Sequence, residues 1–158
     1  MKSLHLLSIA DGDYDLESSY GVGIHRKYDI LNMMNDNENK CVSDFGDRGD
    51  MAFYFKFNHP VTLKAVQFVA CKQRGPKKVW FYANKDLKHR FPRQLEDHEN
   101  INPTTRITFA PEQLSANWPP VELNGYAFED ITEITIYIEN NQTGTDCIEI
   151  TRFKLYAV

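Results

Sequence analysis

The sequence predicts an all-β protein, an antiparallel β-sandwich with little helix, folded as a single domain over residues 1–158. The first observation behind this prediction is that apolar and polar residues alternate with a period of two through the middle and the end of the chain. The second is that Gly, Pro, Asn and Asp separate these runs at short intervals. Several short strands with such turn signals, and no convincing long helical pattern, are typical of a sandwich.

The first strand of the middle region is predicted over residues 51–57, where Phe53, Phe55 and Phe57 share one face. Asn58-His59-Pro60 is predicted to be the turn that ends this strand, because Asn and Pro both favour turns.

Two more strands follow in order. Residues 61–70 are predicted to form a strand that is buried on both faces at its end. Gly75-Pro76 marks the next turn. Residues 78–83 then form a strand that Asn84-Lys85-Asp86 closes.

The clearest alternation lies in residues 133–139, which place three isoleucines on the inner face and polar side chains on the outer face. Together with its neighbours, this strand completes the predicted core. The core residues are Phe53, Phe55, Phe57, Leu63, Val66, Phe68, Val79, Phe81, Ile134, Ile136, Ile138, Phe153 and Leu155.

The last predicted strand contains a change of phase. Ile148 and Ile150 lie on one face of an ideal strand, whereas Phe153, Leu155 and Ala157 lie on the other. Because a slip of one residue inverts every side chain, a bulge near residues 151–152 would return all of them to the core. Elsewhere, residues 11–50 are expected to be mostly loop. Residues 87–117 are expected to be irregular, with one helical turn at 111–114.

The three cysteines are Cys41, Cys71 and Cys147, an odd number with no CxxC pair. They are predicted to be small buried hydrophobes with free thiols in a reducing compartment. The apolar stretch at residues 4–10 is interrupted by His5 and makes a poor secretory signal, and no run is long enough to span a membrane. We therefore expect a cytoplasmic or nuclear protein with no membrane partner.

No catalytic motif is present. The histidines lack HExxH spacing, there is no GxSxG motif, and Gly21-Val22-Gly23 lacks the strand–turn–helix context of a dinucleotide loop. We expect no enzymatic activity, no catalytic residue and no cofactor. Asp36, Glu38 and Asp44 could ligate a structural calcium ion, but solvated loop carboxylates are the preferred interpretation, so no metal site is predicted.

Charge is distributed unevenly along the chain. Residues 72–93 hold eight of the 18 basic residues and one acid, Asp86, although the whole chain has a net charge of −4. Such a segment could dock an acidic protein or nucleic acid, the latter being the weaker alternative. The strand at 78–83 is about 20 Å long and separates the two basic groups, unless the later loop folds back.

Several motifs, taken together, resemble the PITH family. This proteasome-interacting domain occurs at the C-terminus of thioredoxin-like proteins and also as a stand-alone protein. The resemblance covers residues 43–158, and residues 1–42 only faintly. It rests on the order and spacing of motifs that include Ser43-Asp44, Gly75-Pro76-Lys77-Lys78-Val79 and Asn141-Gln142-Thr143-Gly144. The chain departs from the family pattern at residues 45–50, where the family has an acidic stretch.

The resemblance implies a jelly-roll sandwich of the galactose-binding-like type and a non-catalytic protein-binding module that associates with the 26S proteasome. The candidate partner-binding residues are Ser43, Asp44, Lys77, Lys78, Asn141, Gln142 and Gly144. Structural roles are the alternative, because Asn and Gly form turns and Ser-Asp can brace a loop.

A second resemblance shares the same fold. Ser43-Asp44, after Asp36-Asn37-Glu38, is also similar to discoidin and Doc-type domains, although Cys41 stands near the place of the discoidin Trp. A Doc-type domain would bind a ubiquitin-ligase partner, and a discoidin domain a carbohydrate or lipid. An exposed aromatic side chain in the loops at one end of the sandwich would favour the carbohydrate.

Overall fold

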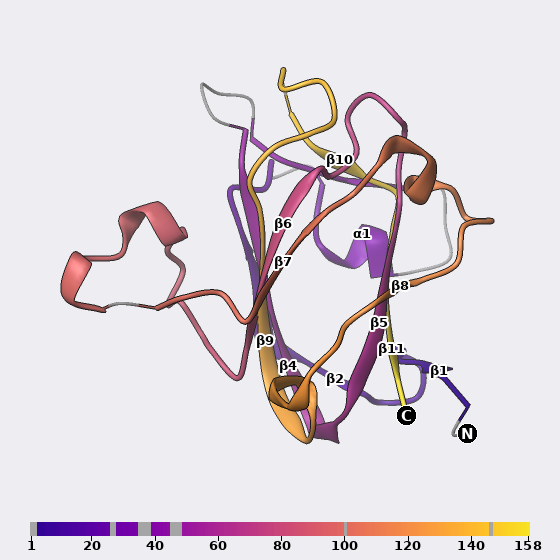
Figure 1. The fold of residues 1–158 in the computed structure, drawn as a ribbon, viewed down its shortest axis with the longest axis vertical. Coiled ribbons are helices and arrows are strands. Elements are labelled where there is room, and N and C mark those ends of the chain that lie inside the picture. The colour runs from indigo at the N-terminus through magenta and orange to yellow at the C-terminus, as the bar shows by residue number, and fades with distance from the viewer. Residues whose placement is uncertain (1–2, 26–27, 35–38, 45–48, 100, 146) are drawn as a thin grey trace.

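Two antiparallel sheets pack face to face in the computed structural model, which describes all residues except 1–2, 26–27, 35–38, 45–48, 100 and 146 (Figure 1). The five-stranded sheet contains, in spatial order, β2 (Tyr14–Val22), β4 (Met51–Val61), β9 (Ile131–Ile138), β6 (Lys78–Ala83) and β7 (Thr105–Thr108). The four-stranded sheet contains β1 (His5–Leu6), β11 (Arg152–Ala157), β5 (Leu63–Val69) and β8 (Val121–Glu122).

Short elements complete the fold. The pair formed by β3 (Cys41–Val42) and β10 (Glu149–Ile150) lies at one end of the sandwich. Helices are few and short: α1 (Leu31–Met34) and the 3-10 turns η1 (Pro92–Gln94), η2 (Asp97–Glu99), η3 (Pro111–Leu114) and η4 (Tyr126–Phe128). No helix among the described residues is long and apolar enough to cross a membrane.

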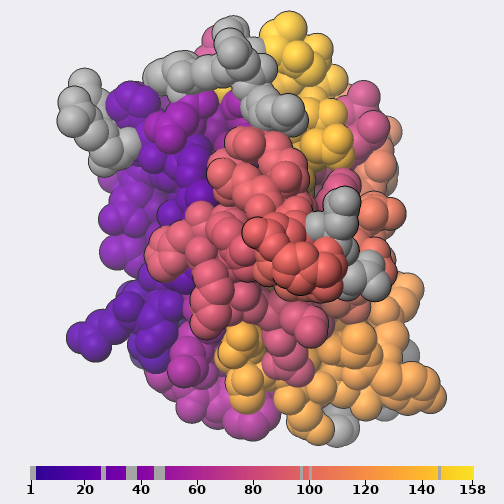
Figure 2. Space-filling view, turned by 90° about the vertical axis from the view of Figure 1, so that its left-hand side faces the viewer, coloured from indigo at the N-terminus to yellow at the C-terminus, as the bar shows by residue number. Residues whose placement is uncertain are grey.

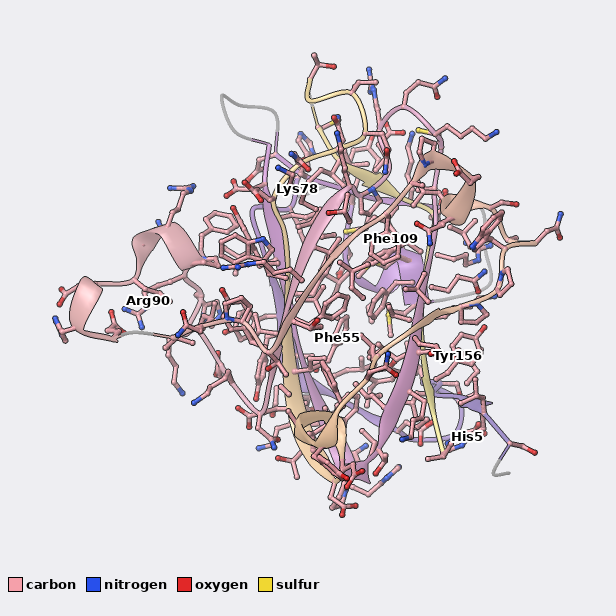
Figure 3. The ribbon with its side chains drawn as sticks, in the orientation of Figure 1. His5, Phe55, Lys78, Arg90, Phe109 and Tyr156 are labelled. Carbon is pink, nitrogen blue, oxygen red and sulfur yellow. The ribbon has the colours of Figure 1, made fainter. Side chains whose placement is uncertain are left out.

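The predicted core is confirmed. All thirteen residues named above are buried and belong to one apolar cluster between the two sheets. Aromatic rings join the layers: Phe55 of β4 stacks on Phe153 of β11 with ring centroids 5.5 Å apart, and Figure 3 shows Phe55 and Phe109 pointing into this space. The helical turn predicted at residues 111–114 is η3.

The predicted turn at Asn58-His59-Pro60 is wrong, because β4 continues through it to Val61. The pairing of β4 with β9 shifts register between Lys56 and Val61, so this segment forms an irregularity inside a long strand. Asn58 is occupied elsewhere: its side-chain amide donates to the carbonyls of Gly12 and Tyr14, at 2.8 and 3.1 Å.

The expectation that residues 11–50 are mostly loop is also wrong, since β2 is a nine-residue strand. It is the edge strand of its sheet, and only Tyr14 among its residues is fully buried. An edge strand with most of its side chains half-buried or exposed needs no strict apolar alternation, so the sequence pattern did not reveal it. The short β7, at the opposite edge, was missed for the same reason.

The phase change near residue 151 is confirmed. The strand breaks at Thr151, between β10 and β11. Its backbone N–H donates to the carbonyl of Val69 at 2.8 Å. The apolar residues on both sides of the break are buried, and they are Ile148, Ile150, Phe153, Leu155 and Ala157.

Residues 84–99 and 101–104, here called the arm, cover the central part of the outer face of the five-stranded sheet (Figure 2). Leu87 and Phe91 of the arm are buried against Tyr82 and Tyr137 of the sheet in a second apolar cluster. Tyr20 of β2 fixes the start of the arm, because its hydroxyl bonds to Asp86 and its ring stacks on His89 at 3.7 Å. The arm therefore turns one outer sheet face into a second buried layer.

Candidate partner-binding site

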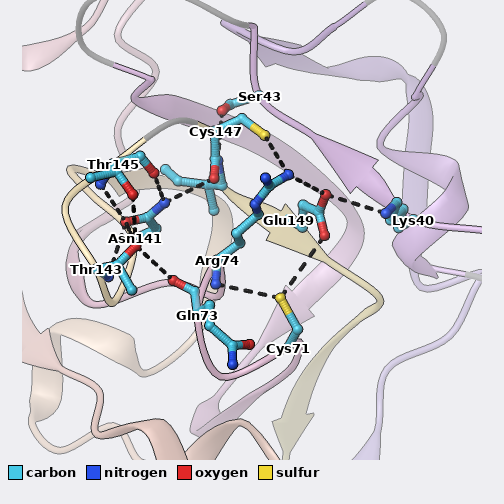
Figure 4. Close-up of polar contacts among 11 residues, drawn as sticks. Lys40, Ser43, Cys71, Gln73, Arg74, Asn141, Thr143, Thr145, Cys147 and Glu149 are labelled. Carbon is cyan, nitrogen blue, oxygen red and sulfur yellow. Dashed lines mark hydrogen bonds and ion pairs between the residues drawn. The ribbon is translucent and has the colours of Figure 1, made fainter.

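The predicted site residues gather at one end of the sandwich, here called the β10 end (Figure 4). Residues 39–44, 71–77 and 140–149 meet there around the β3–β10 pair. Backbone hydrogen bonds join these segments: Ser43 N–H to Ile148 C=O at 3.0 Å, and Glu149 N–H to Arg74 C=O at 3.0 Å. Residues that are distant in the sequence thus become neighbours.

Ser43 has a bracing role. Its side chain is fully buried, and its Oγ accepts a hydrogen bond from the Ile148 backbone N–H at 2.8 Å. Asp44 differs, because it is exposed and its backbone N–H bonds to Gly23 C=O at 2.7 Å. Only Asp44 of this pair has an exposed side chain.

Asn141 organises the 141–147 loop. It is 3% exposed, and its Oδ1 accepts from the backbone N–H groups of Thr143, Gly144 and Thr145 at 3.1, 2.6 and 3.2 Å. Its Nδ2 donates to the carbonyl of Cys147 at 3.0 Å. Gly144 has φ +74, a left-handed conformation that glycine adopts without strain. The Asn141 amide is therefore fully engaged within the chain.

Gln142 holds this loop against the sheet. Its Nε2 donates to Pro76 C=O at 2.8 Å and to Phe109 C=O at 2.7 Å. A side-chain amide that bridges two backbone carbonyls fixes the distance between their segments. Gln142, like Ser43 and Asn141, thus maintains the shape of the β10 end.

Lys77 and Lys78 lie where β6 begins, and their backbones are fixed by Asn140. Lys77 N–H donates to Asn140 C=O at 3.0 Å, and Lys78 N–H to Asn140 Oδ1 at 3.1 Å. Lys78 is exposed, Lys77 is half-buried, and neither ammonium group forms an ion pair with the described residues. Exposed Lys72 adds a third such cation. The β10 end therefore presents lysine charge on a rigid backbone.

A charged cluster lies beside these lysines. Glu149 Oε1 accepts from Lys40 Nζ at 3.2 Å and from Arg74 Nη1 at 3.3 Å. Arg74 also lies between two thiols: its backbone N–H approaches Cys71 Sγ at 3.4 Å and its Nη1 approaches Cys147 Sγ at 3.9 Å. Glu149 is thus neutralised within the chain and does not oppose the lysines.

The prediction that all cysteines are buried is wrong for Cys71, which is exposed at the end of β5. All three cysteines are among the described residues, and none is in a disulfide. Burial raises the pKa of the Cys41 thiol to about 12. Cys71 differs because it lies in the turn that follows β5, outside the core.

A cleft of about 400 Å³, which the sequence did not indicate, adjoins the β10 end on the outer sheet face. Its lining residues are Asp50, Trp80, Pro92, Arg93, Tyr137, Glu139 and Asn140. Buried Asp50 accepts from Tyr137 Oη at 2.9 Å and from Arg93 Nε at 3.3 Å. Burial, and then the bond to Asp50, raises the pKa of Tyr137.

The cleft exists because the arm folds back. Arg93 of the arm and Asn140, beside the lysines, line the same cleft, so the two basic groups are closer than a 20 Å strand suggests. The residue in the sequence that could have indicated this cleft is Trp80, in the strand at 78–83. It is paired with Tyr137 across the sheet, and Arg106 lies over its ring at 4.5 Å.

Metal ligands do not gather here. In the part of the chain that the structure describes, no group of three or more His, Cys, Asp and Glu side chains could hold a metal ion. The calcium alternative at Asp36 and Glu38 lies outside the described residues.

The fold places the chain among the galactose-binding-like jelly-roll domains. It resembles the structure of the CBM32-1, CBM32-2 and M60 catalytic domains of Clostridium perfringens ZmpB, with a TM-score of 0.62 and 12% identity, over 96% of this chain and 15% of that chain. CBM32-3 from a family 31 glycoside hydrolase of the same organism has a TM-score of 0.59 and 8% identity, over 94% of this chain and 97% of that chain. The CBM32-1 and CBM32-2 domains of ZmpB in complex with GalNAc have a TM-score of 0.59 and 13% identity, over 96% of this chain and 35% of that chain.

At such low identity these structures define the fold alone, and the sequence defines the family. The PITH domain model matches residues 23–157, and the chain belongs to the PITH family. This match selects the PITH resemblance over the Doc and discoidin resemblances. Comparison with curated proteins by sequence gives no match.

Proposed function

We propose that this PITH domain is a non-catalytic protein-binding module of the 26S proteasome, and that the β10 end is its contact surface. Family membership supports the class of function. The observation that carries the choice of surface is the group of Lys72, Lys77 and Lys78, whose ammonium groups have no ion-pair partner among the described residues. An acidic surface on the partner would form ion pairs with these lysines.

The predicted site residues divide into two groups. Ser43, Asn141 and Gln142 hold the loops, because their side chains are bonded to backbone groups inside the chain. Asp44, Lys77, Lys78 and Gly144 are left to make the contact. A rigid backbone under the contacting side chains lowers the entropy lost on binding.

Charge reversal at the lysines tests the proposal. The Lys77→Glu/Lys78→Glu variant should lose most of its co-purification with proteasomes from cell extract, and the residual binding should depend less on salt. Its stability should change by less than about 0.5 kcal/mol per site, because both side chains reach solvent.

Lys56→Glu/Lys85→Glu is the matched control, since both lysines are exposed and the net charge changes equally. Equal recovery of proteasomes with the parent and with the Lys77/Lys78 variant would remove the β10 end as the contact. If microscopy found the tagged chain outside the cytoplasm and the nucleus, this would contradict the proposal that its partner is the proteasome.

A further inference from the structure

Several exposed apolar residues lie in or next to the four-stranded sheet. Leu4, Leu6, Trp118 and Tyr126 are the large apolar side chains that are exposed in the described part of the chain, and Tyr126 is 89% exposed. Leu4, Leu6 and Trp118 lie in or next to β1 and β8 of the four-stranded sheet, whereas Tyr126 lies in η4, which precedes β9. Apolar side chains that gather on a protein surface mark an interaction site more often than scattered single residues do.

A groove of about 990 Å³, here called the β8 groove, has Leu4 of these four residues in its lining. Its apolar lining includes Leu4, Ala65, Pro119 and Pro120. Trp118 directly precedes the two prolines, and η4, which carries Tyr126, lies between the lining residues Asn124 and Glu129. The prolines have no N–H to satisfy, so this wall is rigid and apolar.

The outer face of the four-stranded sheet extends the groove. Leu6 of β1 is the cross-strand neighbour of Tyr156 of β11, which in turn pairs with Ala65. Tyr156 Oη bonds to Gln67 Oε1 at 3.3 Å, and Gln67 Nε2 donates to Trp118 C=O at 3.0 Å. Leu6 and Trp118 thus flank one continuous surface, and Figure 3 shows Tyr156 on the side facing away from the other sheet.

The charge of the β8 groove selects its occupant. Glu122, Glu129 and Asp130 line it, are exposed, and form no ion pair with the described residues. Lys64 is the opposing basic residue in the lining. Acidic side chains around an apolar floor complement a ligand that carries both basic and apolar groups.

We propose that the β8 groove is a second docking site of this domain, which binds an extended peptide segment with basic residues and apolar anchors. The apolar anchors contact Leu4, Pro119 and Pro120, and the basic residues pair with Glu122, Glu129 and Asp130. This surface is separate from the lysines of the β10 end and has the opposite charge. It goes beyond the proposed function and stands if that proposal fails.

The two tryptophans of the chain provide the readout. Trp118 lies beside the β8 groove, whereas Trp80 lines the cleft next to the β10 end. The ¹⁵N-labelled full chain is titrated with a synthetic peptide of about eight residues that alternates Leu and Lys, which spans roughly 26 Å when extended. We expect the Trp118 indole signal and the backbone signals of Leu4, Leu6 and Ala65 to shift, with Trp80 unchanged.

A peptide that alternates Ser with Lys lacks the apolar anchors, and a peptide that alternates Leu with Glu lacks the basic charge. Both should bind at least about tenfold more weakly, because each lacks one of the two complementary groups. A Leu/Glu peptide that binds as well as Leu/Lys, or shifts at Trp80 without shifts at Trp118, would overturn the proposal.

Variants complete the test. Glu122→Lys/Asp130→Lys should weaken Leu/Lys binding by about tenfold or more. Glu17→Lys/Glu96→Lys, an equal charge change at exposed sites on β2 and the arm, should bind like the parent. Equal binding by all three proteins would overturn the proposal.

Two other occupants are distinguished in the same experiment. Exposed Tyr126 also fits a carbohydrate, so saturable shifts at the groove with GalNAc and none with the Leu/Lys peptide would overturn the peptide assignment. Trp118 shifts that grow with protein concentration alone would identify a second copy of the chain as the occupant, and would overturn it as well.

Discussion

At the scale of single residues, several polar side chains act inside the chain rather than on a partner. Asn141 supplies acceptors and donors to the backbone of its own loop while it is nearly fully buried. An unsatisfied buried polar group costs more than a hydrogen bond contributes, so these amides cannot be exchanged freely.

Replacing Asn141 with Ala should therefore destabilise the fold. It leaves the N–H groups of residues 143–145 without their acceptor, and the expected loss in free energy of unfolding is about 1–3 kcal/mol. Urea denaturation followed by fluorescence measures it. Asn124→Ala, at an exposed loop position, is the control and should change stability by less than about 0.5 kcal/mol. An unchanged midpoint for Asn141→Ala would mean that the loop is not held by this side chain.

His59 contributes a pH-dependent interaction. Its Nε2 shares a hydrogen bond with buried Asp13 Oδ1 at 2.9 Å, and this bond raises the pKa of His59 above its ordinary value. A raised pKa means that folding favours the protonated ring, so its stabilisation is fully present below about pH 6.5 and is lost as pH rises through the folded-state pKa.

His59→Gln should consequently cost more stability in acid than in alkali. Melting temperatures of parent and variant at about pH 5.5 and about pH 8.5 measure this, and the gap between them should narrow at the higher pH. His5→Gln, at an exposed strand position, serves as the control. A gap that is the same at both pH values would contradict the assignment of the shift to the Asp13 bond.

At the scale of elements, β9 is the centre of the larger sheet. It pairs with β4 on one side and β6 on the other, and its inner isoleucines are fully buried. The arm covers its outer face, so Tyr137 is buried as well. Both faces of this strand therefore contribute to the core.

Truncating Ile136 to Ala should cost about 2–5 kcal/mol, because it leaves a cavity between the two sheets. Chemical denaturation with coincident fluorescence and circular dichroism transitions gives the value. Thr132→Ala, exposed on the same strand, should be close to neutral. If both variants melted like the parent, the register of β9 would be in error.

At the scale of the whole molecule, two surfaces of opposite charge lie on one sandwich. The β10 end carries lysines and the β8 groove carries carboxylates that form no ion pair with the described residues. The arm occupies a third side and shields the outer face of β9. If both proposed sites bind, the domain would contact two partners at once through surfaces built on the same core.

Thiol reactivity measures whether the whole domain stays folded, because it reports which cysteines are accessible. Exposed Cys71 should react with a maleimide in the native protein, whereas buried Cys41 and Cys147 should react only after global unfolding. Mass spectrometry counts the adducts before and after denaturant. Labelling of Cys147 as fast as Cys71 in native conditions would show that the β10 end opens locally, apart from the rest of the fold.

The pattern of apolar residues was sufficient to predict the class of fold, the core and the change of phase near Thr151, because burial on one side of a strand imposes a period of two on the sequence. The predicted bulge is a break between β10 and β11. The edge strands β2 and β7 escaped this pattern because they are only partly buried. The structure places Ser43, Lys78 and Asn141, which were chosen from the family motifs, at one end of the sandwich. Only the tertiary structure decided that Ser43 and Asn141 are braces rather than contacts, because that depends on hydrogen bonds between residues far apart in the sequence.

The cleft at Trp80 and the β8 groove likewise appeared only in three dimensions. Each joins residues from several separate segments, whose positions are fixed by how the arm folds back and how the two sheets end. Local periodicity contains no information on such distant contacts. The sequence by itself determined which side chains are buried in the sheets, and the tertiary structure determined which charges remain unpaired at the surface.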